Sequence, residues 1–340
     1  MPANQQDQRV SEPRARRHAL RIIGNENFVL AIVLIVIMGV MGVLTKGLFL
    51  TPTNIRNLLL RTCIVGVAAV GQAFVVLSAG IDLSVGGVTI LSSCLGAGLM
   101  TANVRLALLP DGAYLPMAAG IVIMVLVGIG VGAVNGFSVS RLRMSPLIVT
   151  IAIWQITKGA AYQLTHRGQL IMKLPDSLAF FGQGNIGGVP VPIIIFILAI
   201  VIGNFVLNYT TFGRFIYAVG GNEASAWLSG IKVQNIRLWV YVVSGFCVGL
   251  AAIIALSRVM CGSTSVVIGL ELDSIAAVII GGVSLFGGKG SMIGVLIGVL
   301  ILAVMDNAMN IMELVPHHQM MIKGAVIIAA VAMDVWRRRR

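Results

Sequence analysis

Charged residues are scarce in this sequence: they make up 11% of its 340 residues, whereas a typical soluble domain carries about 25%. Hydrophobic residues make up 58%, and the mean hydropathy is +0.98. This composition excludes an ordinary soluble fold, and the long apolar stretches exclude the short alternating strands of a membrane β-barrel. Because a helix needs about 20 apolar residues to span a bilayer, the sequence predicts an all-α, polytopic membrane bundle.

Groups for metal binding and covalent catalysis are also few. The four cysteines form no C-x-x-C pair and lie in or beside apolar stretches, so we interpret them as packing residues. His317-His318 lacks further ligands at metal spacing, and no serine, histidine and acidic residue form a nucleophilic arrangement. The GGKGS segment is not a nucleotide-binding loop, since Gly288-Lys289 is followed by Gly290 instead of Ser or Thr. We therefore expect no metal, no cofactor and no enzyme activity in this chain.

Aromatic residues make up only 6% of the chain, which disfavours a stacking pocket of high solute affinity. The net charge of +12 lacks the interleaved aromatics of a nucleic-acid surface, so no nucleic-acid partner is expected. Most basic residues instead fall on the side of the N-terminal tail, which the positive-inside rule assigns to the cytoplasm. The tail has no cleavage pattern of a signal peptide. We expect a cytoplasmic tail (1–27), a membrane domain (28–336) with a cytoplasmic loop (211–233), and a cytoplasmic basic end (337–340).

The uncharged stretches predict about ten transmembrane helices, an even number that places both termini in the cytoplasm. Their expected ranges are 28–46, 54–79, 84–103, 114–140, 146–165, 190–209, 236–258, 271–286, 291–311 and 317–336. Glycines at small-xxx-small spacing, such as Gly128, Gly132 and Gly136, or Gly245 and Gly249, predict closely packed helices.

The loop from Thr211 to Val233 is a long polar interruption between two apolar stretches. Its centre, Asn222 to Leu228, predicts a short surface helix between flexible joints at Gly220-Gly221 and Gly230. Glu223 lies near the start of that helix, where a negative charge is favoured and where it can pair with a basic groove of a partner. The loop is either a docking element for another protein or an ordinary solvated loop.

Polar residues within or between the apolar stretches predict the solute path. Asp82, bracketed by Gly80 and Gly86-Gly87, suits a broken helix, where it either caps the following helix or contacts solute. Asp306 and Asn307 either have a function within the membrane or face the external interface. The predicted path residues are Gln72, Asp82, Asn135 and Asn307.

A faint repeat connects the two halves of the chain. Pro146 opens a helix that contains TKGAA (157–161), and Pro316 opens one that contains IKGAV (322–326). Asn135 and Asn307 lie ahead of them, near the ends of glycine-rich helices. This pattern fits either two inverted halves of five helices or chance matches in a restricted alphabet.

Four segments together resemble the permease subunits of bacterial ABC importers for monosaccharides, the group for ribose, xylose, arabinose, galactose and autoinducer-2. They are GIDLSVG (80–86), TFGRFIYAVGGNEASAWLSGI (211–231), ELDSIAAVIIGGVSLFGGKGS (271–291) and IKGAVIIAAVAMD (322–334). The similarity runs from about Asn54 to the end of the chain.

The resemblance implies a homodimer in the bacterial cytoplasmic (inner) membrane, an ABC ATPase subunit that uses ATP on the cytoplasmic side, and an external or periplasmic sugar-binding protein. It also implies that the loop is the coupling helix that docks on the ATPase. Its expected residues are Gly213, Arg214, Gly220, Asn222, Glu223, Ala224 and Gly230. Nothing in the motifs names the solute. The alternative is an ion-coupled secondary transporter, in which Asp82, Glu271, Asp273 and Asp306 are proton or cation sites.

Overall fold

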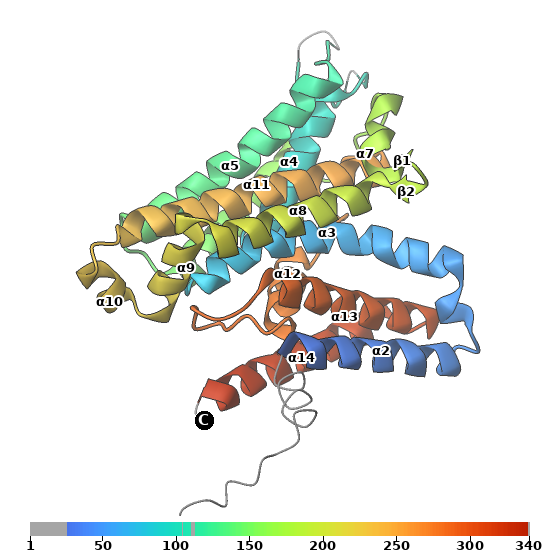
Figure 1. Cartoon of the computed structure of the whole chain (residues 1–340). Coiled ribbons are helices and arrows are strands. Elements are labelled where there is room, and N and C mark those ends of the chain that lie inside the picture. The colour runs from blue at the N-terminus through green and yellow to red at the C-terminus, as the bar shows by residue number, and fades with distance from the viewer. Residues whose placement is uncertain (1–25, 104, 110–112, 339–340) are drawn as a thin grey trace, which may run out of the picture.

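The computed structural model describes residues 26–103, 105–109 and 113–338, most of them in helices (Figure 1). The predicted basic tail lies outside the described residues, apart from Glu26 and Asn27 in the first helix. Residues 339 and 340 of the predicted basic end also lie outside them, whereas the last helix continues to Arg338.

The long helices are α2 (Glu26–Leu44), α3 (Pro52–Leu77), α4 (Val85–Met100), α5 (Met117–Ser140), α6 (Pro146–Leu164), α8 (Val191–Tyr209), α11 (Val233–Val259), α13 (Met292–Ile311) and α14 (Pro316–Arg338). Shorter helices are α7 (Phe180–Gln183), α9 (Thr211–Gly221), α10 (Glu223–Leu228) and α12 (Leu270–Ile280), with 3₁₀ turns at Leu48–Leu50 and Asp176–Ala179. A small antiparallel hairpin joins β1 (Asn185–Ile186) to β2 (Val189–Pro190). The described residues therefore form an all-helical bundle with one minor hairpin.

Each of the ten predicted ranges coincides with a helix, in most cases to within about one turn. Seven helices in the described part of the chain are long and apolar enough to cross a membrane: α2, α3, α5, α8, α11, α13 and α14. Helix α4 has 16 residues, and α12 has 11 because it ends before Gly281-Gly282 instead of continuing to 286. The number of ten crossings therefore stays a prediction.

Helices α5 and α11 pack backbone to backbone along their length (Figure 1). A Cβ atom at Gly128 would overlap the carbonyl oxygen of Gly245, and one at Gly249 would lie 2.8 Å from the Cα of Val125. These are the glycines whose spacing predicts close helix packing, and each leaves no room for a side chain. Their function is thus to join two helices, not to bind a solute.

The same set of neighbours recurs in the two halves of the chain. Helix α4 packs on α5 and α6, and α12 packs on α13 and α14. Helix α5 packs on α11, as α13 packs on α3, while α3 and α11 contact each other at the centre. This pairing is the contact pattern that two related five-helix halves would give.

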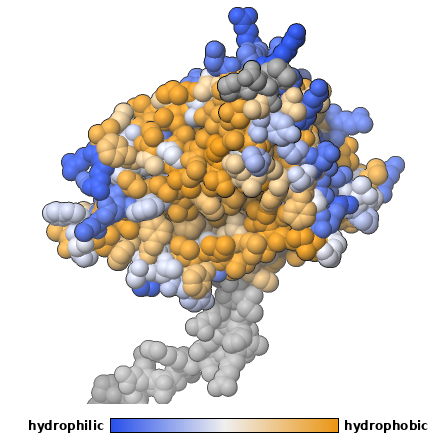
Figure 2. Space-filling model, turned by 90° about the horizontal axis from the view of Figure 1, so that it is seen from above, coloured by the Kyte–Doolittle hydropathy of each residue, from blue (hydrophilic) through white to orange (hydrophobic). Residues whose placement is uncertain are grey.

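The face of the molecule seen in Figure 2 is largely hydrophobic across its middle, with hydrophilic residues gathered at its left, right and upper margins. Exposed aliphatic side chains such as Ile35, Val43 and Ile328 contribute to the apolar surface. A water-soluble protein rarely exposes so much continuous apolar area. The surface therefore suits a lipid bilayer around the helices.

Candidate coupling and solute sites

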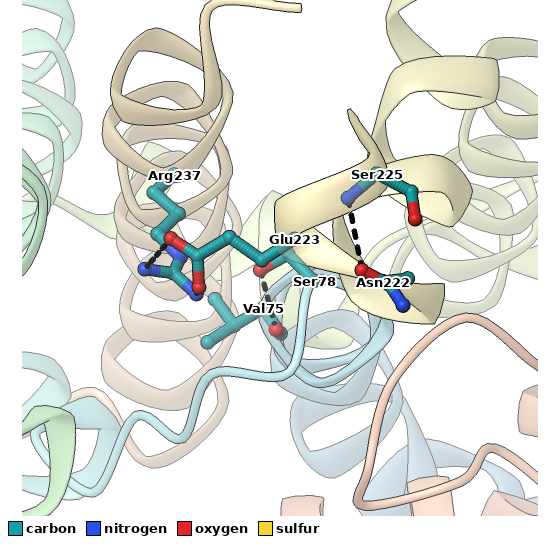
Figure 3. A network of polar contacts seen from close by, with 6 residues as sticks. All are labelled: Val75, Ser78, Asn222, Glu223, Ser225 and Arg237. Carbon is teal, nitrogen blue, oxygen red and sulfur yellow. Dashed lines mark hydrogen bonds and ion pairs between the residues drawn. The ribbon is translucent and has the colours of Figure 1, made fainter. Parts of the chain in front are cut away.

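Helix α10 has the start and stop signals that the sequence predicts. The side chain of Asn222 accepts a hydrogen bond from the backbone amide of Ser225 at 2.9 Å (Figure 3), which satisfies an amide at the start of the helix. Gly230 follows the helix with a φ of 81°, a left-handed conformation that favours glycine. Together they fix where this short exposed helix begins and ends.

An ion pair holds α10 against the start of α11. Two guanidinium nitrogens of Arg237 donate to the two carboxylate oxygens of Glu223, at 3.0 and 2.6 Å (Figure 3). This bidentate ion pair fixes the relative orientation of the two side chains as well as their distance. The carboxylate of Glu223 thus has a basic partner within its own chain, and pairing with a basic groove of another protein stays a prediction.

The outer face of α10 is apolar. Ala226 is buried against the bundle, whereas Trp227 is 69% exposed and Leu228 is 77% exposed. Two large apolar side chains on the exposed face of a short helix form a surface that another protein can cover. Ala224, which the sequence assigns to this site, is also exposed.

Gly213, Arg214 and Gly220 all lie in helix α9, immediately before α10. The side chain of Thr210 caps α9 by accepting from the amide of Gly213 at 3.2 Å, and Arg214 is exposed. Gly220 is buried, and a Cβ atom there would overlap the carbonyl oxygen of Leu77. The interpretation of Gly220 as part of a flexible joint is therefore wrong: it is a contact point that only glycine fits.

The glycine-rich loop 281–291 completes this contact. The amide of Gly288 donates to the carbonyl of Leu77 at 2.9 Å, and the hydroxyl of Tyr217 donates to the carbonyl of Gly290 at 2.9 Å. Leu77 is the last residue of α3. Helix α9, the loop and the end of α3 thus touch at one place, so that a movement of α9 acts directly on the end of α3.

Residues 78–84 form the break between α3 and α4, and Asp82 braces it. Its Oδ1 accepts from the amide of Ser84 at 3.0 Å and from the Ser84 hydroxyl at 2.6 Å, and its Oδ2 accepts from the Ser244 hydroxyl at 3.0 Å. The cap position of α4 is occupied by Ser84, not by Asp82. The Asp82 side chain nevertheless accepts the Ser84 amide at the start of α4, as a capping side chain does, and its other oxygen ties the break to α11.

Two other predicted path residues meet Asp82. The side-chain amide of Gln72, oriented to match its surroundings, donates to the carbonyl of Asp82 at 3.1 Å and accepts from its amide at 3.3 Å. Asn135 donates to the hydroxyl of Ser84 at 2.8 Å. All of these side chains are fully buried among α3, α5 and α11. We call Gln72, Asp82, Ser84, Asn135 and Ser244 the break cluster.

Asn307 lies apart from the break cluster, at the opposite end of α3. Its amide and that of Asn54 donate to each other at 2.9 Å, which links the end of α13 to the start of α3. The structure therefore brings three of the four predicted path residues together and places the fourth at the far end of the bundle.

Charged side chains within the helices pair with one another. Lys323 of α14 contacts Asp273 of α12 at 3.0 Å and Asp306 of α13 at 2.9 Å. Lys158 of α6 lies 4.8 Å from the ring centre of Trp154, and Glu271 of α12 lies near the same indole, beside Gly86. The sequence showed both lysines inside apolar stretches, but it could not show which acids they meet.

A cleft of about 1100 Å³ opens between α10 and the loop from α5 to α6. Its wall includes Ser78 and Gly80 of the break, and Tyr241, whose hydroxyl donates to the carbonyl of Ile81 at 3.0 Å. Glu223 and Arg237 also line it. The cleft therefore extends from α10 to the break between α3 and α4.

An apolar helical bundle with a surface helix connected to a broken central helix is the architecture of a membrane transport subunit. The chain belongs to the family described as branched-chain amino acid transport system / permease component, whose model matches residues 54–331.

Relatives of this chain carry names of sugar permeases. It is 35% identical over 306 residues to the ribose import permease protein RbsC of Haemophilus influenzae, covering 89% of this chain and 91% of that one. It is 39% identical over 288 residues to RbsC of Bacillus subtilis, covering 84% and 86%. It is 34% identical over 334 residues to the L-arabinose ABC transporter permease protein AraH of Azospirillum brasilense, covering 98% and 94%. No solved structure matches the chain.

Proposed function

We propose that this chain is the transmembrane permease subunit of an ATP-driven ABC importer for a monosaccharide or a related small polar solute. The observation that carries the proposal is the physical connection from exposed α10, through α9, to the end of α3 at Leu77. The names of relatives support a sugar as the solute, since they refer to ribose, L-arabinose, D-allose and fructose.

The geometry suggests how ATP hydrolysis in a separate subunit moves this bundle. The ATPase contacts the exposed side chains of Trp227 and Leu228 and displaces α10. The Glu223–Arg237 pair transmits that displacement to α11, while the contact at Gly220 transmits it to α3. Both helices hold the break cluster, so the break opens or closes with the movement of α10. No group of this chain needs to react chemically.

We further propose a homodimer in the bacterial inner membrane, with ten crossings, both termini in the cytoplasm and a sugar-binding protein on the outside. Helix α14 presents an apolar face that a second copy of the chain or lipid can cover, because very little of the helix is buried within the chain. The positive-inside rule supports the orientation, because Arg141, Arg143, Lys232 and Arg237 line the cleft beside α10.

The contacts of the acidic residues do not favour an ion-coupled transporter. Asp82 accepts bonds from two serines, and Asp273 and Asp306 share Lys323. Glu271 lies near Trp154, beside Gly86. An ion-coupled carrier would also leave the exposed apolar face of α10 without a partner.

Reconstitution tests the proposed function. Proteoliposomes that hold the permease, its ATPase and its binding protein should take up one of D-ribose, L-arabinose, D-allose or D-fructose when ATP is supplied on the α10 side. Uptake should persist when ionophores collapse all ion gradients. A Leu228→Cys variant should crosslink to the ATPase. Transport driven by an ion gradient with no ATPase present would refute the proposal.

A further inference from the structure

A polar pocket lies at the end of the bundle opposite α10. It has a volume of about 380 Å³, and six polar residues line it: Asn54, Asn57, Arg61, Arg258, Asn307 and Asn310. A smaller pocket of about 120 Å³ shares Arg61, Asn307 and Asn310 with it and adds Asp306 and Gln319. Apolar residues such as Leu58 and Leu302 line the rest of the smaller pocket. The two pockets adjoin at the ends of α3 and α13, and we call them together the outer pocket.

The outer pocket holds strong donors and acceptors that the chain leaves unused. The guanidinium groups of Arg61 and Arg258 form no hydrogen bond or ion pair with any described residue. The Oδ2 of Asp306 contacts Lys323 at 2.9 Å, whereas its Oδ1 is buried and has no partner in the described part of the chain. Arg61 is exposed and Arg258 is half-buried, so solvent can reach their guanidinium groups. The buried Oδ1 of Asp306 is different, because leaving it without a hydrogen bond is costly, which indicates that a polar ligand completes it.

The chemistry of these groups defines the ligand. A hydroxyl group both donates and accepts, so adjacent hydroxyls can donate to the Asp306 carboxylate while they accept from the Arg61 guanidinium. The volume of the main pocket lies within the range of about 300–1000 Å³ that is usual for small-molecule sites. No aromatic residue lines either pocket, so binding there depends on hydrogen bonds and is weak enough for release.

We propose that the outer pocket is a solute subsite that receives a small hydroxyl-rich molecule, with Asp306 and Arg61 as its direct contacts and Asn310 in its wall. This inference rests on the proposed function, and it adds where the solute binds and which residues contact it. The break cluster does not compete for this role, because its side chains are fully buried and bonded to one another. The subsite lies at the outer end of the path, and the break cluster lies near the inner end.

Cysteine protection tests the subsite without measuring transport. All four native cysteines are buried, so an Asn310→Cys variant offers one reactive thiol in the outer pocket. A membrane-impermeant maleimide should label it from outside, and labelling should slow several-fold with whichever of D-ribose, L-arabinose, D-allose or D-fructose the transporter takes up. The matched control is Asn185→Cys in the exposed outer hairpin, outside both pockets, whose labelling rate should not change with sugar.

A pair of acidic variants separates solute contact from the ion pair. Asp306 and Asp273 both contact Lys323, but only Asp306 lines the outer pocket. In the complete transporter, Asp306→Asn should weaken sugar protection of the Asn310→Cys thiol at least several-fold, whereas Asp273→Asn should leave it near the native value. Equal loss in both variants would show that the ion pair alone matters, and would overturn the subsite.

The outcomes distinguish the inference from the function on which it rests. ATP-driven uptake without any protection of the Asn310→Cys thiol would overturn the subsite and leave the importer assignment standing. Labelling of that thiol only from the side of α10 would overturn the subsite too. Protection in a system whose uptake is driven by an ion gradient would keep the subsite and refute the importer.

Discussion

At Gly220 three segments of the chain meet, and a single hydrogen atom in place of a side chain makes that contact possible. The Cβ atom of a larger residue would overlap the carbonyl oxygen of Leu77 and lie 2.6 Å from the amide nitrogen of Gly288. The neighbour is backbone on both sides, so it cannot move aside without shifting α3 or the loop 281–291. The contact thus depends on this one glycine.

We expect Gly220→Ala to reduce ATP-driven uptake by at least tenfold while the protein still inserts into the membrane. The matched control is Gly221→Ala, where an added Cβ meets nothing within 4 Å. Initial uptake rates and ATP hydrolysis of the two reconstituted variants check the prediction. Equal activity of both variants would show that the contact at Gly220 has no part in coupling.

The buried carboxylate of Asp82 gives a second prediction at the scale of one residue. Asp82→Asn replaces an oxygen acceptor with a donor opposite the hydroxyls of Ser84 and Ser244. The loss of stability should be about 1–3 kcal/mol, the cost of leaving a buried polar group unpaired, and uptake should fall. Ser244→Ala, which removes one donor, should have a smaller effect. Thermal unfolding in detergent and uptake in proteoliposomes measure both, and wild-type behaviour of Asp82→Asn would remove the residue from the site.

Sequence reasoning at this scale identified unusual residues but not their neighbours. Gln72, Asp82 and Asn135 each drew attention as polar residues among apolar ones, yet their meeting depends on how α3, α5 and α11 cross. A glycine before a helix cap is typical of a flexible loop, so the sequence predicts a joint at Gly220. Only the tertiary structure shows that Gly220 packs against the backbone of Leu77 and Gly288. Trp154 carried no signal of its own, since an indole in an apolar helix is usually packing.

At the scale of elements, α10 is oriented by its own chain before any partner binds. Its cap at Asn222 and the pair between Glu223 and Arg237 set its direction relative to α11 (Figure 3). An exposed pair of this kind contributes only about 0.2–1 kcal/mol to stability. Its contribution is therefore to orientation rather than to folding.

Exchanging the two charges tests this orientation. We expect Glu223→Arg and Arg237→Glu to lower uptake individually, because each places two like charges side by side. The double variant E223R/R237E should recover most of the lost uptake, since the pair re-forms with reversed polarity. Uptake assays on the four forms give the coupling between the two sites. A double variant as poor as the worse single one would mean that Glu223 acts on the partner instead.

Helix positions were predictable because a membrane span leaves a long uncharged signature, and nearly all of the predicted limits agree with the helices observed. The exception at α12 has a physical reason: the glycines at 281 and 282 stop the helix, although the apolar run continues to Phe286. The existence of α9 as a separate helix was not predicted, because its polar residues suggested a loop.

At the scale of the whole molecule, cysteine labelling from the two sides of the membrane tests the predicted orientation. Ala224 in α10 and Asn185 in the outer hairpin are both exposed and lie on either side of α8. Cysteines at these positions should react with an impermeant maleimide from opposite sides, with position 185 labelled in intact cells and position 224 only after lysis. The reverse result would invert the topology and refute the cytoplasmic placement of α10.

The backbone contact between α5 and α11 has a consequence for what can be exchanged between transporters of this kind. The glycines at 128 and 245 hold the two helices together, and the Glu223–Arg237 pair holds α10 against α11. A partner ATPase would therefore bind a helix of fixed orientation, whose large exposed side chains are Trp227 and Leu228. The residues of the proposed solute subsite lie at the opposite ends of α3, α11 and α13. Recognition of the ATPase and recognition of the solute thus depend on separate sets of residues, so that evolution or design can alter one without changing the other.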